Sequence, residues 1–145
     1  MYYFASSNSE KINQFREHYS ELVPLIVEIP EEKWPIPEMV SYRKAKYLES
    51  KGYNKVIVDD RALYIDGLDI PGPNINSYLE LNDTFGDIFG DKNGTFVYSF
   101  AYSCGKYTHV YSNEIDVKIS KEKGKESHWG KLGQYIIPPG YTIQL

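Results

Sequence analysis

The pattern of apolar residues changes along the chain, and this change limits the folds that the chain can adopt. In residues 1–65, short apolar runs typical of strands alternate with segments whose apolar residues recur at helical intervals. In residues 95–120, aromatic and β-branched residues recur at every second position, as in antiparallel strands. Helices that alternate with strands, followed by a β meander, predict an α/β domain with a mixed twisted sheet and flanking helices.

The first sixty residues begin with a strand–helix–strand pattern. Residues 1–6 predict a short buried strand, and Ser7 and Glu10 have the capping-box spacing of a helix start. Apolar residues at helical intervals extend this helix to Leu22. The alternation over 25–29 then predicts a second strand.

A second helix and a strand follow. Pro37 suits the first turn of a helix that runs up to Gly52. The apolar run 55–60 predicts a strand that ends in Asp59 and Asp60. The further elements that we expect are a strand over 62–65, a loop over 66–74, a helix over 75–81, and strands over 95–104, 107–112 and 113–120, with turns at Cys104-Gly105 and near Asn113.

Length, composition and charge exclude several classes of protein. The 145 residues predict a single domain over 1–145, and 41% hydrophobic with 25% charged residues is typical of a folded globular chain. A net charge of −4 with scattered basic residues argues against binding to duplex nucleic acid. No apolar run approaches the roughly 18 residues of a membrane span. The single cysteine, Cys104, favours a reducing compartment, so we expect a cytoplasmic protein.

Three carboxylates are candidates for a metal site. The ends of strands in α/β sheets face ligand crevices, and the adjacent carboxylates of Asp59 and Asp60 suit Mg²⁺. Glu38, at the start of the second helix, is a candidate third ligand. Two structural alternatives stay open. The aspartates also fit a solvated turn, and the helix dipole alone favours a glutamate in a first turn.

The segment 6–11 fits an anion-binding site. Ser6, Asn8 and Lys11 lie where the first strand meets the first helix, and a helix N-terminus presents backbone N–H groups to anions. Hydroxyl, amide and ammonium groups at such a place suit a phosphate. Helix capping by Ser7 and Glu10 is the structural alternative.

Trp129 is the candidate for contact with a base. Its indole ring offers a face for stacking, and the neighbouring His128 offers a hydrogen-bonding group. A surface aromatic residue beside a solvated histidine explains the pair equally well.

Taken in order, these segments resemble the Ham1 family. The family opens with a strand, then Thr/Ser-x-Asn-x-x-Lys, then a helix, and Ser6, Asn8 and Lys11 fill that pattern. It continues with a glutamate at the start of the second helix, an acidic-Asp-Ser/Thr-x-Leu segment, and a loop that closes with Pro-Gly. The matching residues here are Glu38, the run Asp59-Asp60-Arg61-Ala62-Leu63, and Pro71-Gly72. The run after Pro71 is more similar to the eukaryotic inosine triphosphatase branch than to the bacterial one.

The resemblance is weaker after residue 95. Ile136 to Tyr141 is similar to the family's Phe-x-Pro-x-Gly-Tyr segment, but the run 129–134 replaces its Gly-Phe-Gly-Tyr/Trp-Asp-Pro. The family's later Ser-His-Arg would fall after Leu145. We therefore expect the chain to be a shortened, divergent member of the family. Because these elements contact the purine in the family, we also expect the chain to discriminate less strictly among bases.

The resemblance implies a fold, a reaction and a set of site residues. The fold would be of the Ham1/Maf type, with two lobes around a central cleft, and the protein would be a homodimer. The reaction would be the Mg²⁺-dependent hydrolysis of nucleoside triphosphates to monophosphate and pyrophosphate. The implied metal ligands are Glu38, Asp59 and Asp60, with Asp60 also orienting or deprotonating water, and the implied substrate contacts are Ser6, Asn8, Lys11 and Trp129. Two alternatives are a catalytically impaired nucleotide-binding protein and an interaction module on the same scaffold.

Overall fold

The computed structural model describes residues 2–30, 36–68, 70–72, 75–79, 84–125 and 130–141. The strands in these ranges are β1 (Tyr2–Ser6), β2 (Leu22–Ile26), β3 (Val56–Ile65), β4 (Pro71–Gly72), β5 (Asn93–Ser103), β6 (Thr108–Ile119) and β7 (Ile136–Ile137). The helices are α1 (Ser9–His18), α2 (Pro37–Ser50), α3 (Ile75–Leu79), α4 (Thr84–Phe89) and α5 (Gly130–Gly133). None of these helices is long and apolar enough to cross a membrane.

The strands form one mixed sheet. Their order is β2-β1-β3-β5-β6-β7, and β4 pairs with β3 outside this series. β1 is parallel to both β2 and β3, whereas β3 is antiparallel to β4 and β6 is antiparallel to β7. The prediction of an α/β fold with a mixed sheet and flanking helices is confirmed.

Contacts along the chain define two compact units. The first contains Met1–Asp60 and Tyr98–Ser112, and the second contains Arg61–Val97 and Asn113–Leu145. β3, β5 and β6 contribute residues to both units. That residues 1–145 act as a single domain stays a prediction.

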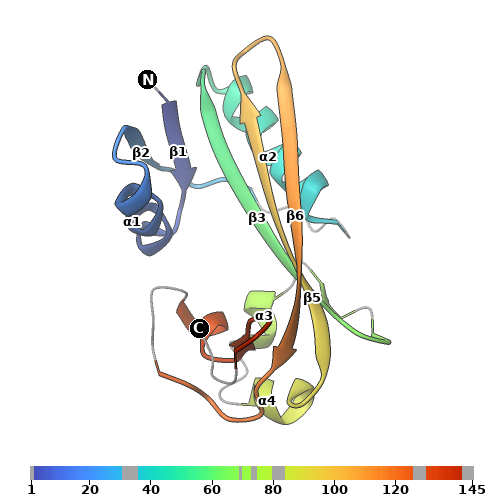
Figure 1. Cartoon of the computed structure of the whole chain (residues 1–145). Coiled ribbons are helices and arrows are strands. Elements are labelled where there is room, and N and C mark those ends of the chain that lie inside the picture. Colours follow the sequence, from blue (N-terminus) through green and yellow to red (C-terminus); the bar gives the residue numbers. More distant parts are fainter. Residues whose placement is uncertain are drawn as a thin grey trace. The chain divides into compact units, whose positions relative to one another are not determined.

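In the first unit, α1 packs beside the parallel strands β1 and β2 (Figure 1). Phe4 of β1, Ile12 of α1 and Leu22 of β2 are its buried cluster, and Phe15 of α1 packs against them. Such a strand–helix–strand unit buries one apolar side of the helix against the sheet. The strand expected at residues 1–6 and the helix after it are confirmed.

α2 begins and ends where the sequence predicts. Pro37 occupies the first turn, where its missing N–H group costs nothing. After Ser50, Gly52 takes a φ of +92°, and the Tyr53 N–H group donates to the Leu48 carbonyl over 3.1 Å. This left-handed glycine with its backward hydrogen bond is the common way in which a helix ends.

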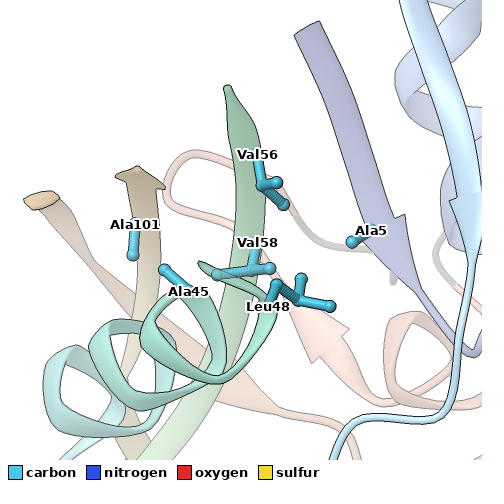
Figure 2. Packing of buried hydrophobic residues seen from close by; sticks show 6 residues of the cluster. All are labelled: Ala5, Ala45, Leu48, Val56, Val58 and Ala101. Atoms are coloured by element: carbon cyan, nitrogen blue, oxygen red, sulfur yellow. The ribbon is translucent and has the colours of Figure 1, made fainter. Parts of the chain in front are cut away.

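α2 covers the face of the sheet opposite to α1. Figure 2 shows Ala45 and Leu48 of α2 against Val56 and Val58 of β3. All four side chains are fully buried. The odd-numbered neighbour Ile57 instead packs in the cluster beside α1, because successive strand residues point to opposite faces. Two small residues, Ala5 and Ala101, complete the cluster of Figure 2.

A tight turn joins β5 and β6 at their ends in the first unit (Figure 1). The Cys104 N–H group donates to the Tyr107 carbonyl over 3.1 Å. Gly105 has a φ of +85°, and a Cβ atom at this position would collide with the Asn54 side chain. The turn predicted at Cys104-Gly105 is confirmed.

The second unit is built around aromatic rings. Phe85 and Phe89 of α4 are fully buried, with ring centroids 5.0 Å apart. Tyr78 of α3 lies against Phe89, and Tyr135 lies against Phe85. α3 confirms the helix expected at 75–81, whereas α4 and α5 are too short for helical periodicity to reveal them.

One predicted boundary in the first unit is wrong. α1 ends at His18, and Leu22 begins β2 instead of ending the helix. Leu22 pairs with β1, and its side chain is buried against Phe4 and Ile12, so its apolar character has a cause other than a helical stripe. β2 consequently covers Leu22–Ile26 rather than 25–29. Pro24 is tolerated within it because β2 is an edge strand of the sheet.

Two strands are longer than expected. β3 continues from Val56 to Ile65, so Asp59 and Asp60 lie within a strand and not at its end. β6 likewise continues through Asn113, where the sequence predicts a turn. Asn113 is exposed, and a polar residue is compatible with the solvent side of an antiparallel strand.

Candidate functional site

Asp59 and Asp60 extend beyond the parallel part of the sheet. The pairing of β1 with β3 reaches Ile57, and β1 itself ends at Ser6. The two aspartates therefore follow the last residue of β3 that pairs with β1, near the carboxyl end of β1, where parallel sheets place ligand sites. Since they are neighbours in a strand, their side chains point to opposite faces.

Asp59 faces the α1 side, where Lys11 and Tyr98 contact its carboxylate. The Lys11 Nζ atom lies 3.2 Å from Oδ1 and 3.1 Å from Oδ2 of Asp59. The Tyr98 hydroxyl donates a short hydrogen bond of 2.6 Å to Oδ2. Asp59 is only 3% exposed, and a buried carboxylate requires such charged and hydrogen-bonding partners.

Asp60 faces the α2 side and is less well satisfied. The Lys44 Nζ atom lies 3.4 Å from Oδ1 of Asp60 and also donates to the Asp59 carbonyl at 3.2 Å. Oδ2 of Asp60 is buried without a hydrogen-bond partner in the part of the chain that the structure describes. Burial raises the pKa of Asp60 from 3.8 to about 6, and the nearby negative charge of Asp59 adds to the rise, while Lys44 opposes it.

The turn between β1 and α1 brings the predicted phosphate contacts together. The Asn8 N–H group donates to the Ser6 hydroxyl oxygen at 3.0 Å. Oδ1 of Asn8 in turn accepts from the Lys11 N–H group at 3.3 Å. Asn8 therefore caps α1, which corrects the prediction that Ser7 does so. The same turn places Lys11 in the first turn of the helix, from which its ammonium group reaches Asp59.

Glu38 lies in the first turn of α2 and is half-buried. Its carbonyl accepts from the Ser41 hydroxyl at 3.1 Å, and the hydroxyl oxygens of Ser41 and Ser99 are 2.7 Å apart. Across the described ranges, no three histidine, cysteine, aspartate or glutamate side chains form a group that could hold a metal. The structure thus brings Lys11 to Asp59 and Lys44 to Asp60, but it does not gather Glu38 with the aspartates as a ligand set.

Two groups at the site are not identified from the sequence. Lys44 has one signal, since it lies four residues from both Val40 and Leu48 and so shares their buried side of α2. A lysine on the buried side of a helix indicates a buried negative partner. Tyr98 has no such signal, because β5 is rich in aromatic residues on that face. Trp129, the predicted base contact, lies outside the described residues.

The fold is similar to three solved structures, each matched over 99% of this chain. A nucleoside-triphosphatase, dITP/XTP pyrophosphatase, from Mycobacterium abscessus is 19% identical with a TM-score of 0.71 over 87% of its chain. The Ham1 protein of Staphylococcus aureus is 21% identical with a TM-score of 0.67 over 84% of its chain. A HAM1 protein from Coxiella burnetii is 18% identical with a TM-score of 0.77 over 85% of its chain.

The sequence itself matches the Ham1 family over residues 2–131. A comparison with curated proteins gives no match. The matched range covers most of the 145 residues and includes both aspartates and the turn that carries Ser6, Asn8 and Lys11. Because this match covers most of the chain, the chain belongs to the Ham1 family.

Proposed function

We propose that the protein is a nucleoside triphosphate pyrophosphatase, which hydrolyses a triphosphate to a monophosphate and pyrophosphate. One observation carries the proposal: in a Ham1-family chain, two neighbouring aspartates of β3 each contact a lysine. Asp59 contacts Lys11, which belongs to the β1–α1 turn with Ser6 and Asn8, and the half-buried Asp60 contacts Lys44 of α2. The similar protein of Mycobacterium abscessus is a dITP/XTP pyrophosphatase. Non-canonical purine triphosphates are therefore the substrates that we propose.

The residues at Asp60 fit a divalent cation. Oδ2 of Asp60 is a buried, negatively charged oxygen without a hydrogen-bond partner among the described residues. Burying such an atom is costly unless a cation or a donor meets it. We propose Mg²⁺ as that cation, because it takes oxygen ligands and accompanies nucleotide phosphates. When bound, Mg²⁺ neutralises charge on the phosphate oxygens as the reaction proceeds.

Glu38 would join Asp60 in holding the ion, and Asp59 would take part through its negative charge. A helical side chain leans toward the N-terminus, so the Lys44 ammonium group lies over the turn nearer to Glu38. Asp60, which contacts that ammonium group, therefore faces the same part of α2. Asp59 adds negative charge from the opposite face, and its carboxylate holds Lys11.

Asp60 is also the proposed base. A general base works best when its pKa is near the working pH, and the pKa of about 6 that Asp60 has without a bound ion meets this condition. The Asp60 carboxylate would orient a water molecule and take its proton as the oxygen attacks the α-phosphorus. The bond from that phosphorus to the bridging oxygen then breaks, and pyrophosphate leaves. Lys11, with Ser6 and Asn8, would hold the negatively charged chain during the attack.

The test is a screen for pyrophosphate release. The wild-type protein is given ITP, XTP, dUTP and the common nucleoside triphosphates with Mg²⁺, and Asp60→Asn is measured in parallel. We expect release from ITP or XTP by the wild-type protein and none by Asp60→Asn, because an amide takes no proton. Nucleotide binding without turnover would instead support the alternative of an impaired nucleotide-binding protein.

The base contact, the assembly and the compartment are proposals that rest on the sequence and the family resemblance. Trp129 is the proposed stacking residue for the base. We also propose a homodimer that acts on the nucleotide pool of the cytoplasm. Light scattering of the purified protein gives the assembly directly, and a monomer that is fully active would remove the homodimer from the proposal.

A further inference from the structure

We propose that Tyr98 is a positioning residue, which fixes the Lys11 ammonium group by holding Asp59. The contacts form a continuous chain: the Tyr98 hydroxyl donates to Oδ2 of Asp59 at 2.6 Å, and the Lys11 Nζ atom lies 3.1 Å from the same oxygen. The inference rests on the proposed function in one respect, because it takes Lys11 to be the group that binds phosphate.

Lys11 needs a fixed partner because a lysine carries its charge at the end of four flexible carbons. Without such a partner, the ammonium group would have to be ordered when the substrate binds, and this ordering weakens binding. Asp59 is on a sheet strand and is 3% exposed, so water cannot replace its protein partners. A carboxylate in this position can hold the ammonium group in place before the phosphate arrives.

Asp59 in turn depends on Tyr98 for its orientation. The Tyr98 ring stacks on Phe100 of the same strand, with centroids 4.7 Å apart, and meets the edge of the Phe15 ring at 6.3 Å. Phe15 and Lys11 are four residues apart on α1 and lie on the same side of that helix. The helix that carries the ammonium group therefore also packs against the ring that holds its carboxylate partner.

The structure has a second lysine–aspartate contact that serves as an internal comparison. Lys44 contacts Asp60 on the opposite face of β3, and no contact joins it to the Tyr98 hydroxyl among the interactions of the described residues. A positioning role predicts that loss of this hydroxyl affects Lys11 and spares Lys44. A purely structural role predicts that both lysines become more mobile together, because the strand between them is loosened.

The first experiment uses Tyr98→Phe, which removes the hydroxyl and keeps the ring. We expect KM for the nucleoside triphosphate to rise about tenfold, while kcat changes by less than about twofold. In a Lys11→Met background, the same substitution should cause no further rise, since the group that it positions is absent. Tyr102→Phe removes a hydroxyl from the same face of β5 and should leave KM unchanged. Equal effects of Tyr98→Phe in both backgrounds would overturn the proposal.

The second experiment needs no turnover. Reductive methylation of the intact protein, followed by peptide mass spectrometry, measures how fast each lysine amine reacts. In Tyr98→Phe, we expect Lys11 to react several times faster than in the wild-type protein and Lys44 to react at its former rate. An unchanged Lys11, or an equal rise at both lysines, would overturn the proposal. If the wild-type protein hydrolyses no triphosphate, the proposed function fails, and this measurement alone decides the role of Tyr98.

Discussion

The Nζ atom of Lys44 lies 3.4 Å from Oδ1 of Asp60, and yet the pKa of this carboxyl is raised to about 6. Burial is the largest cause of the rise, and the charge of Asp59 adds to it. The attraction of Lys44 lowers the pKa but does not cancel the loss of water around the carboxylate. Asp60 is therefore held in a state that favours uptake of a proton or of a metal ion.

The rate of hydrolysis should depend on pH through Asp60. If its carboxylate accepts the proton from water, kcat/KM should rise as pH increases through about 6, since only the ionised form is a base. The profile is measured with one purine triphosphate at a low, constant concentration of free Mg²⁺, because an ion bound to the Asp60 carboxylate lowers its pKa. Asp60→Asn should abolish the activity and with it this limb of the profile. A rate that is flat between about pH 5 and 7 would show that Asp60 is not the base.

The free energy of unfolding should also depend on pH through Asp60, but it should decrease as pH rises. Because the pKa of Asp60 is higher in the folded state than its ordinary 3.8, the folded protein binds the proton more tightly. Stability contributed by this proton is present at low pH and is lost as pH rises through about 6. The rise of this pKa from 3.8 to about 6 corresponds to about 3 kcal/mol.

Asp60→Asn removes the carboxyl group that titrates, so a comparison with this variant isolates the contribution of Asp60 to the pH dependence of stability. Relative to the wild-type protein, the Asp60→Asn variant should gain stability between about pH 4 and 7, by an amount on the order of 3 kcal/mol. Urea unfolding at several pH values, without divalent ions, measures the difference. A difference that stays constant over this range would mean that the pKa of Asp60 is not raised in the folded protein.

Lys44→Met should move the pH profile upward. The ammonium group of Lys44 lowers the pKa of Asp60, so its removal should raise that pKa further and shift the acidic limb of kcat/KM to higher pH. Lys46→Met is the matched control, because Lys46 is on the same helix but is exposed, and its contacts are with Glu49 and the Tyr42 ring rather than with an aspartate of β3. A shift of the same size in both variants would contradict the specific role of Lys44.

Mg²⁺ should stabilise the protein against heat in proportion to its binding. A ligand at roughly 100 times its Kd, bound only by the folded state, adds about 2.7 kcal/mol. We expect Asp60→Asn to lose this stabilisation and Glu38→Gln to weaken it, whereas Glu17→Gln, at an exposed position of α1, should leave it intact. If Glu38→Gln responds to Mg²⁺ like the wild-type protein, Glu38 is not a ligand. An undiminished response of Asp60→Asn would place the ion elsewhere.

The sequence predicts those parts of the site that local patterns encode. Ser6, Asn8 and Lys11 are recognisable because a strand, a polar turn and a helix follow one another within a few residues. The aspartates are recognisable because they interrupt an apolar run. Their arrangement is not predictable in the same way. The sequence predicts that the strand ends at Asp60, and this prediction does not say where the two side chains point. In the structure β3 continues past Asp60, so the side chains of Asp59 and Asp60 point to opposite faces.

The rest of the site depends on contacts between distant parts of the chain. Tyr98 meets Asp59 only because β5 pairs with β3, and Lys44 meets Asp60 only because α2 packs on the face of the sheet opposite to α1. Neither the strand order nor the rotation of α2 follows from the period of the local sequence. The same limit explains the misplaced start of β2, since Leu22 fits a helical stripe and a parallel strand equally well.

Identification of the reaction products tests the proposed activity most directly. The wild-type protein is incubated with ITP and Mg²⁺, and phosphorus NMR follows every phosphate-containing species. We predict that inosine monophosphate and pyrophosphate appear in equal amounts and that Asp60→Asn produces neither. Formation of inosine diphosphate and free phosphate, or no hydrolysis of any purine triphosphate by the metal-loaded protein, would contradict the proposed function.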